Sequence, residues 1–203
     1  MATATRIARD RARGVRAIVL DVDGVLTDAS LLYSSKGESL KRFSARDGFA
    51  IKLAQREGIP VAILSGRVSA PLRARLADLD IGDAIVIQGS RDKGTGLRLL
   101  CERLGLEPAE IAFMGDDLPD LPALALAGLA ACPADAAREV RERCHVVCQA
   151  PAGRGAVREL VELVLVARGR WDEIVKEWAA GRTELTAAPT PRPRSRRSHG
   201  RES

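Results

Sequence analysis

Two aspartates that lie one residue apart, Asp21 and Asp23, follow directly after the apolar run 17–20. Unpaired charge at the end of a buried strand is costly, so this position favours a chemical role for both acids. Asp21 could attack the phosphorus of a phosphate ester and form an aspartyl-phosphate, which replaces one difficult displacement with two easier ones. Asp23 could protonate the departing alkoxide and later take a proton from water. If the substrate is a phosphate ester, both acids therefore have a role in phosphoryl transfer.

A third acid, Asp116, follows the apolar run 111–114 in the same way. Carboxylates beside a phosphoryl group repel it, so the predicted reaction needs a divalent cation between them. Mg²⁺ suits a site with few protein oxygens and several waters. We expect Asp21, Asp23 and Asp116 to form the metal site.

The transferring phosphoryl group also needs hydrogen-bond donors and positive charge. Ser65 and Gly66 follow the apolar run 61–64, and Lys93 follows the next run of this kind. We expect these three residues to bind the phosphate, with Lys93 neutralising charge on it and on Asp21. Each has a simpler reading: Ser65 could only cap a helix, and Lys93 could be a solvated residue of a first helical turn.

Two more acids, Asp117 and Asp120, come shortly after Asp116. Adjacent acids can share the tasks of binding a metal, supporting its ligands and capping backbone N–H groups. We expect both to support the metal ligands rather than to bind the metal. Asp120 could instead cap the helix that starts near Leu121.

Short apolar runs alternate with helical patterns along the chain, which is typical of an α/β fold. The runs are apolar at every position, as in strands that are buried on both faces of a parallel sheet. We therefore predict a Rossmann-like three-layer sandwich whose mainly parallel sheet collects the polar groups at the carboxyl ends of its strands. The expected strands are 17–20, 61–64, 84–87, 111–114, 129–132 and 145–148, and the expected helices are 50–57, 70–79, 93–104, 121–127, 134–143, 156–168 and 171–179.

Residues 31–43 depart from this alternation and predict a small β-hairpin after the first strand. Only 44 residues lead from Asp21 to Ser65 and 28 from Ser65 to Lys93, which leaves no room for a separate cap domain. A capless site is open, so the exclusion of water and the selection of substrate have to come from elsewhere, most simply from a neighbouring subunit. We expect the hairpin to mediate that assembly.

The body of the chain, from about Arg16 to Trp178, resembles the haloacid-dehalogenase-like superfamily of aspartate-nucleophile phosphatases. Four motifs carry this resemblance, and all four occur in order. One motif alone would be weak evidence, but together they are specific. The motifs are Leu20-Asp21-Val22-Asp23-Gly24-Val25-Leu26-Thr27-Asp28, Leu64-Ser65-Gly66-Arg67, Asp92-Lys93 and Gly115-Asp116-Asp117-Leu118-Pro119-Asp120.

More narrowly, the chain resembles the 3-deoxy-D-manno-octulosonate 8-phosphate phosphatase family. This resemblance implies a Mg²⁺-dependent homotetramer that acts in lipopolysaccharide sugar synthesis on an eight-carbon 2-keto acid phosphate. It makes Asp47 and Arg67 candidate substrate contacts, and the planar fork of an arginine suits the carboxylate of such a substrate. The chain departs from the family in the residues after Gly181, which do not align with it. The stretches that carry the resemblance are 25–28, 46–51, 88–89, 115–120 and 153–159.

Other interpretations of these residues stay open. Arg67 could pair with a surface acid, and Asp47 could cap the helix that starts near Gly48. The same chemistry could act on another sugar phosphate, such as a nine-carbon keto acid phosphate, because the phosphate-site residues would be identical. A noncatalytic oligomeric module that binds a ligand is a further alternative, but such a module has no need of the whole set of charges.

The net charge of +5 on 203 residues is concentrated at the two ends of the chain. We predict a flexible basic N-terminus (1–14, charge +3), one phosphatase domain (15–181) and a disordered Arg/Pro-rich tail (182–203, charge +4). The tail lacks the aromatic side chains on which bases stack, so nucleic-acid binding is not favoured. The longest apolar stretches are shorter than the roughly 20 residues of a membrane span. The predicted location is the cytoplasm.

Overall fold

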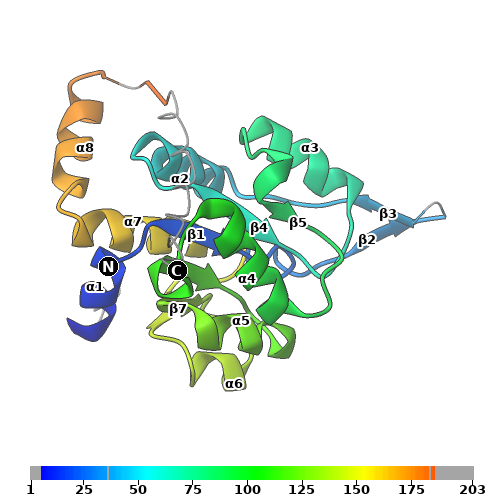
Figure 1. Cartoon of the computed structure of the whole chain (residues 1–203). Helices are drawn as coiled ribbons and strands as arrows, with labels where there is room; N and C mark the ends of the chain where they lie inside the picture. Colours follow the sequence, from blue (N-terminus) through cyan, green and yellow to red (C-terminus); the bar gives the residue numbers. More distant parts are fainter. Residues whose placement is uncertain (1–5, 36, 183, 186–203) are drawn as a thin grey trace, which may run out of the picture.

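Six short strands form one parallel sheet at the centre of the molecule (Figure 1). The computed structural model describes residues 6–35, 37–182 and 184–185. The strand order is β5-β4-β1-β6-β7-β8, and each neighbouring pair is parallel, which confirms the predicted α/β fold. The strands are β1 (Ala17–Leu20), β4 (Val61–Leu64), β5 (Val86–Ile87), β6 (Ile111–Met114), β7 (Leu129–Cys132) and β8 (Val146–Val147).

The inner strand β1 determines where the polar loops leave the sheet. It pairs with β4 on one side and with β6 on the other, and Leu20 lies opposite both Ile63 and Met114. All three strands are four residues long, apolar and fully buried. They therefore end at the same edge of the sheet. The loops that begin at Asp21 and Ser65 start there side by side.

Helices cover both faces of the sheet, and an apolar cluster fills the space on each side (Figure 1). The larger cluster lies under α1 (Arg6–Arg13), α2 (Ala45–Arg56), α3 (Ala70–Asp78), α7 (Ala156–Ala167) and α8 (Trp171–Ala179). The smaller cluster lies under α4 (Lys93–Leu104), α5 (Leu121–Leu126) and α6 (Arg138–Arg141). Aliphatic side chains dominate both clusters, in line with an aromatic content of only 3%.

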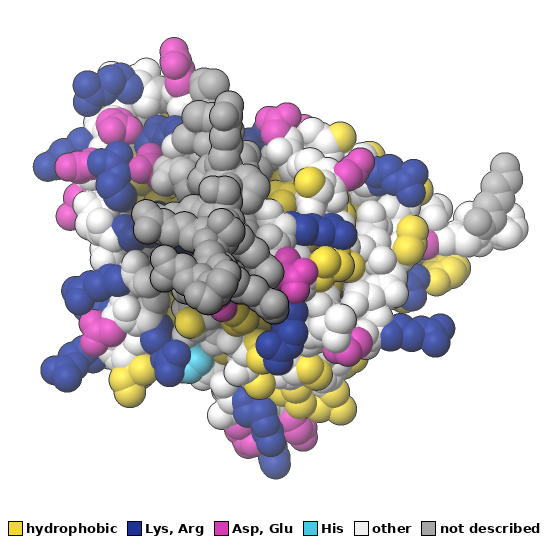
Figure 2. Space-filling view, in the orientation of Figure 1, with side chains coloured by type: hydrophobic (Ala, Val, Ile, Leu, Met, Phe, Trp, Pro, Cys, Tyr) yellow, Lys and Arg dark blue, Asp and Glu magenta, His cyan; other side chains and the backbone are white. Residues whose placement is uncertain are grey.

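The hairpin predicted after the first strand consists of β2 (Leu32–Ser34) and β3 (Gly37–Leu40), which pair antiparallel. Among the described residues these two strands pair only with each other, and they project from the body of the molecule (Figure 1). Leu32, Tyr33 and Leu40 expose large apolar side chains. Figure 2 shows hydrophobic side chains on the surface next to the projecting hairpin. An exposed apolar surface of this kind is typical of an interaction site.

Several segments differ from the sequence prediction. Only the second half of the predicted strand 84–87 is extended, because Asp83–Ile85 form a 3-10 turn. The helix predicted over 134–143 is reduced to the four residues of α6. The basic segment 1–14, predicted to be flexible, contains α1, because Ala8 and Ala12 lie four residues apart on one helix face and pack without exposure against the body.

The two predicted terminal segments, 1–14 and 182–203, are only partly covered by the described residues. Of the tail predicted to be disordered, 182–203, only residues 182, 184 and 185 are described. Within the described ranges, each helix is too short or too polar to cross a membrane.

Candidate active site

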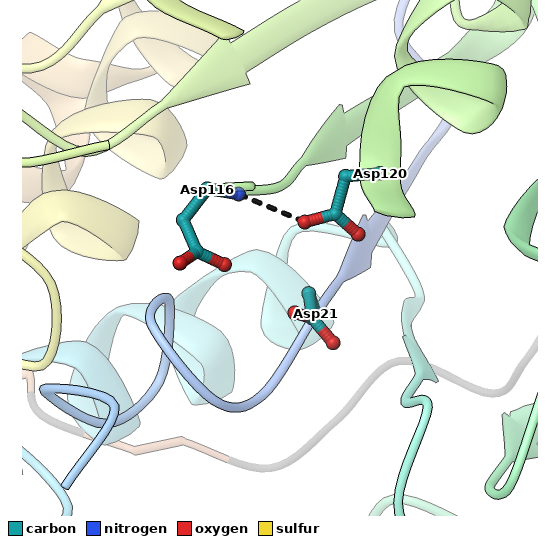
Figure 3. Close-up of side chains that lie close together, drawn as sticks. All are labelled: Asp21, Asp116 and Asp120. Carbon is teal, nitrogen blue, oxygen red and sulfur yellow. Dashed lines mark hydrogen bonds between the residues drawn. The ribbon is translucent and has the colours of Figure 1, made fainter. Parts of the chain in front are cut away.

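Three carboxylates gather at the edge of the sheet where β1 and β6 end. Asp21 directly follows β1, Asp116 lies two residues beyond β6, and Asp120 closes a 3-10 turn, Leu118–Asp120. Each of them offers an oxygen within 4.8 Å of the other two, and Figure 3 shows the side chains close together. A compact group of carboxylate oxygens is the kind of ligand set that Mg²⁺ and other hard cations prefer.

Asp120 holds the loop of this cluster in place. One carboxylate oxygen, Oδ2, accepts the backbone N–H of Asp116 at 2.9 Å (Figure 3) and that of Asp117 at 3.3 Å. The other, Oδ1, accepts a hydrogen bond from Lys93 Nζ at 2.7 Å. The side chain makes no cap hydrogen bond to α5, so the alternative interpretation, that Asp120 caps this helix, is wrong. Asp117 caps the preceding 3-10 turn, where it accepts the N–H of Leu118 at 2.8 Å.

Lys93 is the first residue of α4, and its buried ammonium group joins the cluster from the opposite side. Its Nζ lies 2.7 Å from Asp21 Oδ1 and 2.7 Å from Asp120 Oδ1. A buried ammonium is costly unless it is paired and hydrogen-bonded. Burial acts against the charged form, but the two carboxylates outweigh it and raise the pKa of Lys93. The structure thus brings Lys93 and Asp21 together, as the sequence predicted.

Negative charge in the cluster exceeds positive charge. Burial and then the neighbouring acids Asp21, Asp120 and Asp117 raise the pKa of Asp116 to about 8. Burial and the charge of Asp120 raise the pKa of Asp21 to about 6, against the opposing effect of Lys93. Three carboxylates therefore share one lysine. A divalent cation would balance this charge, so the residues fit a metal site on electrostatic grounds as well as by ligand type.

Two glycines permit the close approach of backbone and carboxylates in this site. A Cβ atom at Gly24 would lie 2.0 Å from Asp116 Oδ2, and the backbone there has a φ of +89°, which favours glycine. A Cβ atom at Gly115 would lie 2.5 Å from the Cβ of Asp120. The glycine of the Asp21-Val22-Asp23-Gly24 motif is therefore required by space and by conformation.

Ser65 begins the loop after β4 at the same edge of the sheet. Its side chain is buried, and Oγ accepts the backbone N–H of Arg67 at 3.2 Å. Its backbone is tied to the neighbouring strand end, because Ser65 N donates to Ile87 O at 2.8 Å and Ser65 O accepts from Ser90 N at 3.1 Å. Gly66, next to it, is exposed. These contacts fix the Ser65 hydroxyl in a loop whose next residue, Gly66, is open to solvent.

Comparison with known proteins identifies the family in which this arrangement of residues occurs. Residues 43–128 match the haloacid dehalogenase-like hydrolase family. The chain is 39% identical over 163 residues to the 3-deoxy-D-manno-octulosonate 8-phosphate phosphatase KdsC of Escherichia coli K12, covering 80% of this chain and 86% of the relative. The chain belongs to the 3-deoxy-D-manno-octulosonate 8-phosphate phosphatase family. It is a phosphatase with a haloacid dehalogenase-like fold.

Two solved structures of this phosphatase family resemble the fold closely. The Moraxella catarrhalis phosphatase, determined in complex with a magnesium ion, a phosphate ion and a KDO molecule, superimposes with a TM-score of 0.82 at 34% identity. The match covers 86% of this chain and 99% of that structure. The cobalt-bound Haemophilus influenzae phosphatase gives a TM-score of 0.77 at 38% identity, covering 79% of this chain and 93% of that structure.

Within this phosphatase fold, Asp23, which the sequence placed among the metal ligands, lies outside the three-carboxylate group. Its Oδ1 accepts a hydrogen bond from Lys41, and its Oδ2 lies 3.6 Å from Arg67 Nε. Arg67 also donates to the hydroxyl of Tyr33 in the hairpin at 2.8 Å. Arg67 therefore lies beside Asp23, at the junction of the site and the hairpin. Sequence reasoning missed Lys41, since a lysine at a strand end gives no local signal of burial.

The structure places Asp47 outside the carboxylate cluster of the phosphatase site. Its side chain is only 1% exposed, and its two oxygens accept the N–H groups of Gly155 at 3.0 Å and of Arg158 at 2.9 Å. These donors belong to the N-terminal end of α7, where a carboxylate is favoured. Ser44, not Asp47, caps α2. Asp47 therefore caps a different helix from the one predicted, and its contacts are with backbone.

Replacing Asp47 with alanine is expected to lower the free energy of unfolding by about 2–4 kcal/mol, because two buried N–H groups lose a charged acceptor. Urea denaturation measures this change. Asp10→Ala is the matched control: Asp10 is 55% exposed and pairs only locally with Arg13, so its loss should cost less than about 0.5 kcal/mol. An unchanged stability of Asp47→Ala together with a large rise in KM would favour the substrate-contact interpretation instead.

Proposed function

We propose that this phosphatase hydrolyses 3-deoxy-D-manno-octulosonate 8-phosphate to the free sugar acid and phosphate, in the cytoplasm, as a step of lipopolysaccharide sugar synthesis. The observation that carries this proposal is the cluster of Asp21, Asp116 and Asp120 around Lys93, in a chain of this family. Asp21 lies beside the cationic Lys93, which would neutralise charge as the Asp21 carboxylate attacks phosphorus. This arrangement favours a covalent aspartyl-phosphate over direct attack by a water molecule that general acids and bases alone activate.

The reaction starts with Asp21. One oxygen of its carboxylate attacks phosphorus, and the bond between phosphorus and the sugar oxygen breaks as Asp23 gives that oxygen a proton. A water molecule then attacks the phosphorus of the aspartyl-phosphate and gives its proton to Asp23. Phosphate leaves, and the Asp21 carboxylate is restored. The protons balance, because Asp23 loses one in the first step and regains one in the second.

The remaining residues bind and neutralise the phosphoryl group. Lys93 offsets its charge, and Ser65 Oγ together with the backbone N–H groups of 22–24 donates hydrogen bonds to it. The carboxylates of Asp21 and Asp116 would hold Mg²⁺, whereas the Asp23 side chain is paired with Lys41 and Arg67. When bound, this ion supplies positive charge that offsets the repulsion between carboxylates and phosphate. Asp117 and Asp120 keep the loop and Lys93 in position.

The exposed hairpin supports assembly into a homotetramer. Leu32, Tyr33 and Leu40 form an apolar surface on an element that projects from the body, and Arg67 reaches from the phosphate loop to Tyr33. A neighbouring subunit on this surface would cover the open site and complete the contacts with the sugar. Light scattering of the purified protein tests this assembly, and a fully active monomer would refute the shared site.

The substrate is tested by phosphate release from a panel of esters with and without Mg²⁺. The panel contains the eight-carbon and nine-carbon keto acid phosphates and common hexose phosphates. We expect a strong, Mg²⁺-dependent preference for the eight-carbon ester. A preference for another ester would retain the mechanism on Asp21 and replace the substrate, whereas no release from any ester would favour a noncatalytic binding module.

Mg²⁺ is expected to raise the melting temperature more at pH 8 than at pH 5.5. Without the ion, the folded pKa of Asp116 is about 8 against an ordinary value of 3.8. The folded chain then retains a proton that the unfolded chain has lost, so its stability falls as the pH rises from about 4 to 8. Bound Mg²⁺ would favour the charged form of Asp116 in the folded chain, so this loss of stability at high pH would disappear. At 100 times its Kd the ion contributes about 2.7 kcal/mol, or roughly 5–10 °C.

Thermal denaturation with EDTA or with Mg²⁺ at the two pH values measures this effect. Asp116→Asn is the control, because its amide does not titrate and is a weaker ligand. This variant should lose the fall in stability between about pH 6 and 8 and most of the stabilisation by Mg²⁺, while Asp21, whose pKa is about 6, keeps its own contribution below that range. Stabilisation by Mg²⁺ of equal size at both pH values would contradict the link to Asp116.

A further inference from the structure

Lys41 is an internal lysine at the point where the hairpin returns to the body of the protein. It directly follows β3, and its chain neighbours are open to solvent: Leu40 is 63% exposed and the side chain of Arg42 is 65% exposed. The side chain of Lys41 is 0% exposed. A lysine side chain is flexible and strongly hydrated, so complete burial of its ammonium group requires partners.

Two carboxylates provide those partners, and one of them is Asp23. Lys41 Nζ donates to Asp23 Oδ1, and it lies 2.7 Å from Glu38 Oε1 on β3. The other oxygen of Asp23 lies 3.6 Å from Arg67 Nε. Asp23 thus has a cation beside each of its oxygens. Its carboxylate has one orientation in this environment, and the hairpin contributes the closer of the two cations.

A group that transfers a proton must lie within hydrogen-bond reach of the leaving oxygen, and its geometry decides how well it works. Asp23 follows the nucleophile on a loop, and its side chain is partly open to solvent. A carboxylate in such a position can rotate unless it is held by neighbours. The buried Lys41 is the neighbour that can hold it, because a buried cation with two carboxylate partners has little freedom of its own.

We propose that Lys41 is a positioning residue that holds the Asp23 carboxylate in the orientation needed for proton transfer, with Glu38 anchoring Lys41 to the hairpin. This inference rests on the proposed function, in which Asp23 is the acid and base. It assigns the hairpin a second task, since the element that presents the apolar surface also sets the geometry of a reacting group. Lys41 itself does not touch the substrate.

The competing explanation is that Lys41 only stabilises the fold. Substrates with different leaving groups distinguish this explanation from a positioning role. A sugar alkoxide needs protonation as it departs, whereas p-nitrophenolate departs without it. Loss of Asp23 positioning therefore slows the formation of the aspartyl-phosphate from the sugar phosphate much more than from p-nitrophenyl phosphate, whereas the second step, in which Asp23 is the base, is the same for both substrates. General damage to the site or to the hairpin would slow both reactions equally.

The experiment compares Lys41→Met, Lys41→Arg and the control Arg42→Met with the wild type in the full chain. For Lys41→Met we expect kcat/KM, which reports the formation of the aspartyl-phosphate, to fall about 10- to 100-fold on the sugar phosphate. Its kcat/KM on p-nitrophenyl phosphate should fall by less than about 3-fold. Lys41→Arg should restore at least part of the activity on the sugar phosphate, because it restores the cation. The side chain of Arg42 is 65% exposed and pairs with Asp28, away from Asp23 and Lys41, so Arg42→Met should match the wild type.

Equal losses on both substrates, or no loss on either, would overturn the positioning role. If Lys41→Met does not fold, Lys41→Gln keeps the length and a hydrogen-bond donor, and the ratio of the two losses is measured on that variant. Failure of the proposed substrate is detected separately, because the wild type would then not hydrolyse the eight-carbon ester. The same ratio is in that case measured with the sugar phosphate that the wild type does hydrolyse.

Discussion

Replacing Asp21 with asparagine is expected to reduce phosphate release by about 10⁴-fold or more, which is the scale seen when a nucleophile is removed. The amide has nearly the same shape, but it cannot form the aspartyl-phosphate and it is a poorer metal ligand. Lys93 keeps Asp120 as a partner at 2.7 Å, so its ammonium group is not left unpaired. The fold should therefore persist.

The measurement is phosphate release at saturating substrate and Mg²⁺, together with a melting curve and a size determination. Asp172→Asn is a matched control, because it makes the same chemical change at an exposed position of α8. This control should retain full activity. Turnover of Asp21→Asn above about 1% of the wild type, with an intact fold, would refute the nucleophile assignment.

Replacing Asp23 with asparagine is expected to lower kcat on the sugar phosphate by about 10²- to 10⁴-fold, the usual contribution of general acid-base catalysis. The amide keeps the shape of the side chain and can still accept a hydrogen bond from Lys41, but it has no proton to give to the alkoxide. Hydrolysis of p-nitrophenyl phosphate should suffer less in its first step, since that leaving group needs no acid.

Steady-state kinetics on both substrates measure this prediction. A pre-steady-state burst of p-nitrophenolate provides a sharper test, because the variant should still form the aspartyl-phosphate and then hydrolyse it slowly. Equal losses on the two substrates without a burst would assign Asp23 a role in holding the site together instead of in moving protons.

The sequence was sufficient to predict the sheet and the positions of the main polar groups. Runs such as 17–20 and 111–114 are apolar at each position, and only a strand covered on both faces buries such a run fully. Once those strands are parallel and in register, the residues that follow them must meet at one edge. The proximity of Asp21 and Lys93 follows from this rule and from the helix that begins at Lys93.

The sequence was insufficient where a side chain finds its partner far along the chain. Asp47 binds backbone N–H groups 108 and 111 residues away, and no local pattern encodes that contact. Lys41 was missed for a related reason, because its burial depends on how the hairpin folds back onto the loop that carries Asp23. The partner of Asp120 was equally hidden: its place directly before α5 left a helix-cap role open as an alternative, while its carboxylate accepts a hydrogen bond from Lys93.

The hairpin shares no strand pairing with the central sheet among the described residues, and this separation has a consequence for how such an enzyme can change. In the proposed assembly, substitutions in 31–40 other than at Glu38, which anchors Lys41, would alter the surroundings of the sugar and leave the register of the sheet and the carboxylate cluster untouched. Under the proposed function, substrate range and phosphate chemistry would thus be largely independent traits of the chain. Lys41 is the point at which they meet, so libraries that randomise the hairpin to obtain new specificities should keep this residue fixed.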